Sequence, residues 1–202
     1  MGQGDTASTD RVAEDISGTD LAANNAPGVM AGGINFYNTT TGARAVTIGD
    51  VFDEVDGIDK DDRVRYDLPE IQGVNFAISH TSGGSWDVGG GWAGQVGDTE
   101  LEVAGFLAHI AATSTTDEKS FGGSASLKHA LGFSLTVAGA SRDQKTSGRD
   151  SPNYLWGKVG YSAMLTSLGE THFGVSYGRY DDFAQNADEA TELGFAVVQD
   201  ME

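Results

Sequence analysis

The stretch "VNFAIS" at residues 74–79 alternates large apolar side chains with small or polar ones. The same period of two recurs in "WDVGGGW" at 86–92 and in "FSLTVA" at 133–138. Successive side chains of a β-strand point to opposite faces of a sheet. The pattern therefore predicts strands with one apolar face and one face of small or polar residues.

Comparable segments continue to "TELGFAVVQ" at 191–199, and about nine strands are expected from residue 62 onward. Their connections alternate in length. Short ones are expected at 69–73, 96–98, 130–132 and 166–170 and long polar ones at 113–120, 142–153 and 181–190, with the short gap at 82–84 as the exception. Tight turns at one end and longer loops at the other are typical of antiparallel barrels in outer membranes.

The composition agrees with an all-β protein. Glycine is abundant at 29 residues and proline rare at 3, and glycine costs roughly 1 kcal/mol per helix-interior site relative to alanine. The 12 basic residues are scattered against 30 acidic ones, which excludes nucleic acid as a partner because phosphate binding needs clustered cations. The sequence contains no cysteine, so disulfides and thiolate chemistry are excluded.

A membrane address is compatible with the low mean hydropathy of -0.27. No apolar run of about 18 residues suggests a spanning helix, whereas a spanning strand needs only about ten residues of alternating polarity. The opening residues "MGQGDTAST" lack the basic start and apolar stretch of a secretory signal. We expect the signal to be missing from this chain.

A soluble β-sandwich or barrel is the alternative explanation of the same alternation. In that case the chain would be an exported β-rich surface or binding protein without a pore. Two features favour the membrane. The polar faces are built from Gly, Ser and Ala rather than Lys and Glu, and aromatic residues such as Trp86, Phe133 and Tyr180 lie near strand ends, where membrane barrels place aromatic girdles.

Four segments carry a resemblance to a known family. "GQGDTAST" (2–9), "DISGTDLA" (15–22), "DDRVRYDLPEIQGVNFAISH" (61–80) and "GFAVVQ" (194–199) resemble the general porins of Gram-negative bacteria. The third is the most specific, because in such porins an Arg-containing strand ends in a Tyr-x-x-Pro turn and an aromatic-rich strand returns. The likeness covers most of the chain.

The resemblance implies an antiparallel transmembrane β-barrel of 16 strands, here an incomplete, open segment of about nine lacking both ends. Residues 1–61 would form the end of the preceding strand and the loop that folds into the barrel and narrows it, and residues 62–202 the barrel strands. The expected partners are outer-membrane lipid and lipopolysaccharide, two further copies in a homotrimer when complete, and the ions and small hydrophilic solutes that diffuse passively through the channel.

The same resemblance implies site residues. Porins oppose acidic residues on the infolded loop with arginines on the wall. The candidates for this constriction are Glu14, Asp15, Asp20, Arg63 and Arg65. Alternation then gives as lumen-facing candidates Asn75, Ser79, Ser124, Ser126, Lys128, Ser134 and Thr136, and as lipid-facing candidates Phe76, Ile78, Leu135, Val137, Phe173 and Val175.

No motif points to an enzyme, a metal or a cofactor. The four histidines, at positions 80, 109, 129 and 172, are spread singly, without the spacing of a zinc site. The acidic run "GDVFDEVDGIDKDD" (49–62) lacks the ligand positions of an EF-hand loop. No nucleophile elbow or phosphate loop occurs. An enzyme would require a histidine to converge with a serine or an acid in space.

Overall fold

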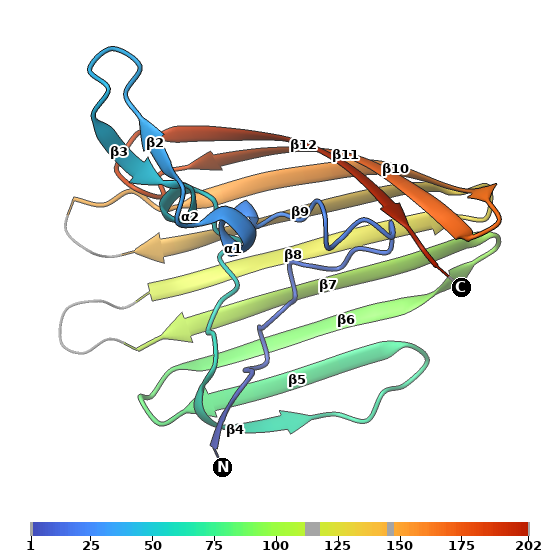
Figure 1. The fold of residues 1–202 in the computed structure, drawn as a ribbon. Helices are drawn as coiled ribbons and strands as arrows, with labels where there is room; N and C mark the ends of the chain where they lie inside the picture. The colour runs from blue at the N-terminus through green and yellow to red at the C-terminus, as the bar shows by residue number, and fades with distance from the viewer. Residues whose placement is uncertain (1, 112–117, 145–147, 202) are drawn as a thin grey trace.

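The computed structural model of the chain describes residues 2–111, 118–144 and 148–201. Its main feature is one antiparallel sheet of ten strands in the order β1-β4-β5-β6-β7-β8-β9-β10-β11-β12, which is not closed (Figure 1). After β1 (Gly2–Gly4), each strand pairs with its neighbour in sequence from β4 to β12. The all-β antiparallel prediction is therefore confirmed.

The nine strands after residue 60 match the expected number. They are β4 (Asp61–Asp67), β5 (Val74–Thr81), β6 (Trp86–Val96), β7 (Thr99–Ile110), β8 (Glu118–His129), β9 (Phe133–Gln144), β10 (Asn153–Thr166), β11 (Gly169–Asp181) and β12 (Glu189–Gln199). The short connections that follow β4, β6, β8 and β10 all lie at one end of the sheet, whereas the short connection at 82–85 lies at the other end with the longer ones. Of the long connections predicted at the other end, residues 112–117 and 145–147 lie outside the described residues.

The convex face of the sheet is apolar and exposed. Register places large side chains of neighbouring strands side by side: Leu135 lies opposite Val159, Val159 opposite Val175, and Val175 opposite Phe195. All four are exposed, Phe195 to 72%. In water such a surface would be unfavourable, but it is the surface that a barrel turns toward lipid.

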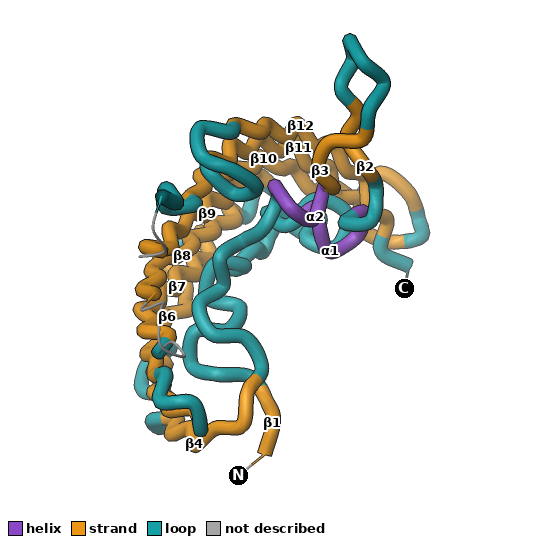
Figure 2. Tube along the Cα trace, turned by 90° about the vertical axis from the view of Figure 1, so that its left-hand side faces the viewer, coloured by secondary structure: helices purple, strands orange, loops and turns teal. Residues whose placement is uncertain are grey.

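Residues 5–60 lie on the concave side: the chain crosses the strands from the β4 side toward β12 and returns to β4, and the hairpin around residues 36–45 projects away from the sheet (Figures 1 and 2). This segment, which we call the inner segment, contains α1 (Pro27–Ala31), α2 (Ile48–Val51) and a two-stranded sheet of β2 (Asn35–Tyr37) and β3 (Arg44–Thr47). A capping box between Thr47 and Asp50 starts α2. Among the described residues no helix has the length and apolar character needed to cross a membrane.

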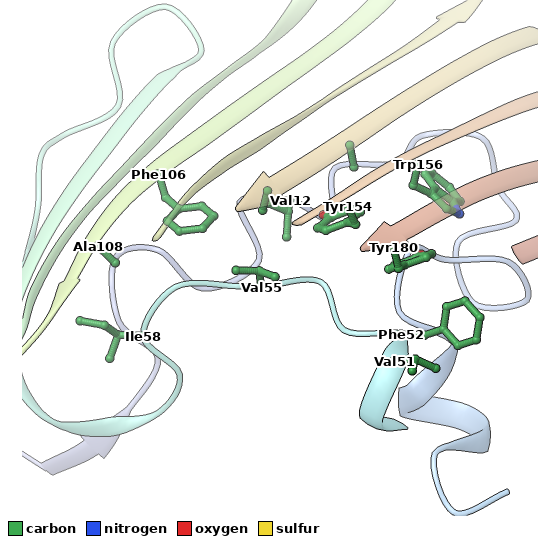
Figure 3. Close-up of a cluster of buried hydrophobic side chains, with 12 residues drawn as sticks. Val12, Val51, Phe52, Val55, Ile58, Phe106, Ala108, Tyr154, Trp156 and Tyr180 are labelled. Atoms are coloured by element: carbon green, nitrogen blue, oxygen red, sulfur yellow. The ribbon is translucent and has the colours of Figure 1, made fainter. Parts of the chain in front are cut away.

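A small hydrophobic core joins the inner segment to the wall. Val12 and Val55 of the segment, each 1% exposed, lie among Phe106, Tyr154 and Tyr180 of the wall (Figure 3). The rings of Tyr154 and Tyr180 stack at 5.5 Å. Burial of apolar side chains therefore holds the segment against the wall, and hydrogen bonds hold its backbone.

The two faces should differ sharply in their tolerance of charge. We expect Val103→Arg on the convex face to lower the free energy of unfolding from lipid by up to about 2–4 kcal/mol, the cost of arginine near the bilayer midplane. Ala93→Arg is the matched control, because Ala93 is exposed on the concave face opposite Glu102, the residue before Val103. Denaturant titration in vesicles measures both, and equal losses would contradict the assignment of faces.

Candidate functional site

The inner segment begins at a buried carboxylate on β6. Asp87 is 0% exposed, and one of its oxygens accepts a hydrogen bond from the Ser8 amide at 2.8 Å and another from the Ser8 hydroxyl. Its other oxygen accepts from the Ser79 hydroxyl, and Ser79 Oγ in turn accepts from the Ala7 amide at 3.2 Å. The Asp87 carboxylate and the Ser79 hydroxyl thus provide hydrogen-bond partners for the amides of Ser8 and Ala7, which lie in an irregular stretch of backbone.

Glycine allows the backbones to approach closely at this point. A Cβ on Gly89, two residues beyond Asp87, would lie 2.0 Å from the carbonyl oxygen of Ala7. Beside it, Arg11 donates from Nη1 to the side-chain oxygen of Asn75 at 2.7 Å. The "DVGGGW" run therefore serves close packing of the segment on the wall.

Serine hydroxyls on β8 continue the attachment. Ser124 Oγ accepts from the Glu14 amide at 3.1 Å and donates to the Arg11 carbonyl at 3.0 Å. Two residues along the strand, Ser126 Oγ accepts from the Ile16 amide at 3.1 Å. Two hydroxyl groups that are two residues apart on β8 thus bond to two amides that are two residues apart on the segment, much as a neighbouring strand would.

Farther across the wall, a lysine meets an acid of the segment. Lys158 of β10 forms an ion pair with Asp15, and their side chains are 0% and 7% exposed. Lys158 also donates to the Ala23 carbonyl at 2.9 Å, and Thr136 donates to Asp15 at 3.1 Å. Beyond this pair, Asn25 donates to the Tyr154 hydroxyl at 2.9 Å.

The side of the inner segment that the wall leaves uncovered is acidic. Asp10, Asp20, Asp53 and Asp59 are exposed. Glu14 is half-buried, and its burial together with the charge of Glu102 raises its pKa. The free surface over the concave face therefore carries negative charge, which attracts cations in water.

Two further carboxyl groups of the segment are partly buried. Burial, with the charges of nearby carboxylates, raises the pKa of Glu54 to about 7. Burial also raises the pKa of Asp56 to about 8, although the hydrogen bond from the Asp10 amide opposes the shift. Both groups therefore change charge near neutral pH.

The two arginine candidates lie on the concave face but do not meet the expected acids. Arg63 donates to the Asp5 carbonyl, and Arg65 donates to the Thr6 carbonyl at 2.7 Å and pairs with Asp67. Both therefore hold the start of the inner segment. Asp15 meets Lys158 instead, because the segment has reached β10 by that residue. These contacts differ from the opposition of Arg63 and Arg65 to Asp15 and Asp20 that the resemblance implies.

The remaining candidates lie on the two faces of the sheet, in surroundings that differ from residue to residue. The alternation places Asn75, Ser79, Ser124, Ser126, Lys128, Ser134 and Thr136 on the concave face and Phe76, Ile78, Leu135, Val137, Phe173 and Val175 on the convex face. Five of the lumen-facing candidates are buried rather than open, so charge there would displace neighbours: Ser79, Ser124, Ser126, Ser134 and Thr136, at 2%, 7%, 1%, 5% and 1%. Phe173 is half-buried.

Asp87, Arg11 and Lys158 are site residues that sequence reasoning does not single out. Asp87 and Lys158 stand on polar strand faces where most neighbours are Gly, Ser or Ala. A charged residue at such a position is costly to bury without a partner. A single charged residue among small residues on a strand face is therefore unusual, and this feature of the sequence could have identified both Asp87 and Lys158.

One serine, one histidine and one acid do converge near the turns between β10 and β12. Ser162 Oγ lies 2.7 Å from His172 Nδ1, and Asp200 Oδ2 lies 3.0 Å from Nε2. Ser162 and His172 are each 4% exposed, and a Cβ on Gly18 would lie 2.6 Å from Nδ1. The segment thus covers the approach that acyl transfer needs. Among residues 2–111, 118–144 and 148–201 no cluster of three metal-ligating side chains occurs.

Removing the Asp87 carboxylate should release the start of the inner segment. We expect Asp87→Ala to cost about 1.5–3 kcal/mol of local stability, because hydrogen bonds to a charged group are lost. Hydrogen exchange of the peptide amides around Ala7 and Ser8 measures it. Asp143→Ala, at an exposed position of β9, is the control, and equal protection in both variants would contradict the anchoring role.

Comparison with known proteins agrees with this geometry. Searches of curated proteins and of solved structures gave no match. A family model described as Gram-negative porin matches residues 1–202. The chain, an open antiparallel sheet with an apolar outer face, therefore belongs to the family of Gram-negative porins, the channels of the bacterial outer membrane.

Proposed function

We propose that the concave wall and the inner segment line the narrow part of a water-filled channel, through which ions and small hydrophilic solutes diffuse passively. The observation that carries this proposal is the course of residues 5–60 across the polar face of the sheet (Figure 2). A segment held there reduces the cross-section without closing it. In this proposal Glu14, Asp15, Asp20, Arg63 and Arg65 belong to the constriction as charges or as supports.

A preference for cations follows from how the charges are distributed. The acids Asp10, Asp20, Asp53 and Asp59 are exposed, whereas Lys158 is buried in an ion pair. The chain also carries a formal net charge of -18. A passage lined by one sign of charge raises the local concentration of the opposite ion.

The surroundings of the channel follow from the outer face and from the family. The exposed apolar rows of β9 to β12 suit contact with outer-membrane lipid. Contact with lipopolysaccharide and assembly as a homotrimer are proposed from the likeness to general porins. Passive diffusion needs no reactive group, cofactor or metal, because the channel acts through its width and charge.

Planar-bilayer recording of the purified porin tests the proposal. We expect ohmic conductance and a reversal potential in a salt gradient that shows cation selectivity. The triple variant Asp10→Asn, Asp20→Asn, Asp59→Asn should lower the selectivity, and Asp143→Asn should leave it unchanged. An absence of conductance would contradict the channel, and anion selectivity would contradict the charge argument.

Selectivity should also depend on pH through Glu54 and Asp56. Because their pKa values are raised from 4.5 to about 7 and from 3.8 to about 8, the folded segment binds more protons than the unfolded chain across that window. The folded segment is therefore most stable at low pH, where both carboxyl groups are neutral, and it loses stability as pH rises through about 7 to 8. Over the same range two negative charges appear in the lumen.

We therefore expect cation selectivity to increase between about pH 6 and about pH 9. Reversal potentials measured at constant ionic strength check this. The double variant Glu54→Gln, Asp56→Asn should flatten the dependence in that range. An unchanged slope in that variant would assign the titration to other groups.

A further inference from the structure

We infer that Lys158 is a positioning residue of the channel: from the middle of β10 its buried ammonium group holds the inner segment at the wall through Asp15 and Ala23. The inference rests on the proposed function, because it concerns where the acidic segment stands in the lumen. It assigns to one wall residue the ionic attachment of the segment, beside the hydroxyl groups of Ser124, Ser126 and Thr136.

The contacts of Lys158 come from three directions. Its Nζ forms the ion pair with Asp15, donates to the Ala23 carbonyl at 2.9 Å, and lies 5.5 Å from the ring centroid of Trp156. The segment therefore folds around the ammonium group, with one contact before its turn at Gly18 and one after it. One side chain fixes two points of the segment.

Neighbouring residues bind the Asp15 carboxylate and leave space for the lysine side chain. Thr136 of β9 donates to Asp15 Oδ1 at 3.1 Å, and the Ser17 amide donates to the same oxygen at 3.0 Å. On β11, a Cβ at Gly174 would lie 2.6 Å from Thr19 Oγ1 and 3.4 Å from Lys158 Cδ. Glycine at that position leaves room for the lysine stem and for the segment together.

Burial distinguishes Lys158 from an ordinary lumen charge. Its side chain is 0% exposed, whereas that of Lys128, on the same face of β8, is 25% exposed and pairs with Glu170 at 3.7 Å. A buried and compensated ammonium group contributes little to the field that a passing ion meets. Its effect on transport must therefore act through the position of the segment.

In a buried ion pair each charge depends on its partner, so Asp15 is stable at the wall only while Lys158 is present. Removing one partner leaves the other charge buried and uncompensated, which costs far more than removing both. Without Lys158, the Asp15 carboxylate would gain by moving into water and would take residues 15–23 away from the wall. Neutralising Asp15 at the same time removes that drive, because an asparagine side chain at this position would still accept hydrogen bonds from Thr136 and Ser17.

Thiol labelling tests the inference independently of conductance. The chain contains no cysteine, so single replacements report on one place each. Ala23→Cys reports on the contact with Lys158 and Ser120→Cys on a buried wall site in β8, since Ala23 and Ser120 are 5% and 2% exposed. The probe is a charged, membrane-impermeant methanethiosulfonate, applied to the purified porin in lipid vesicles.

In Lys158→Met we expect the labelling rate at position 23 to rise about tenfold or more, as for a locally opened segment, while position 120 stays protected. The double variant Asp15→Asn, Lys158→Met should restore protection at position 23, a rescue that general destabilisation would not produce. Lys128→Met is the matched control and should change neither rate.

Two results would overturn the inference. Continued protection of position 23 in Lys158→Met would show that the segment does not depend on the lysine. Labelling of both positions in that variant, without rescue in the double variant, would show that Lys158 supports the whole barrel. Either result leaves the proposed function standing if the wild-type protein conducts, whereas a protein that does not conduct refutes the proposed function and leaves the labelling result valid.

Discussion

The hydrogen-bond needs of an irregular backbone govern the inner face of this protein. Buried amide and carbonyl groups require partners, and most of residues 5–25 form neither helix nor strand. The wall provides the partners from side chains: the Asp87 carboxylate, the Ser124 and Ser126 hydroxyls and the Lys158 ammonium group. The polar face of the sheet is therefore a set of attachment points as well as a wetted surface.

This arrangement separates the charges into two classes. Charges between wall and segment are buried: Asp15 and Lys158 form an ion pair, and Asp87 accepts hydrogen bonds from Ser8 and Ser79. Charges on the uncovered side, such as Asp20 and Asp53, are exposed and acidic. The first class sets where the segment stands, and the second sets the electrostatic potential above it, because the opposite charges of Lys158 and Asp15 offset one another whereas the exposed carboxylates add up to a negative field. Structural support and ion preference thus rest on different residues.

Small residues on the wall make this close attachment possible. Gly89 and Gly174 leave no Cβ where the segment approaches, and small residues such as Ser124, Ser126 and Ala138 occupy further concave positions. Exposed large apolar side chains such as Leu135, Val159 and Phe195 lie on the convex face, whereas Phe106, Tyr154 and Tyr180 on the concave face are buried under the segment. One alternating pattern therefore serves two surroundings, since it presents apolar volume outward and leaves space inward.

The sequence by itself determined the strands, their number after residue 61 and the face to which each side chain points, because a period of two is a local property of extended backbone. It also indicated a long aperiodic segment at the start of the chain. Only the tertiary structure decided which wall residues meet that segment. Thr136 and Asp15 stand 121 positions apart, and no local pattern relates them. Their meeting, and the pairing of Asp15 with Lys158 rather than with Arg63 or Arg65, depend on how far the segment travels across the sheet before each residue, a distance that the packing of Val12, Val55 and their aromatic neighbours fixes in space.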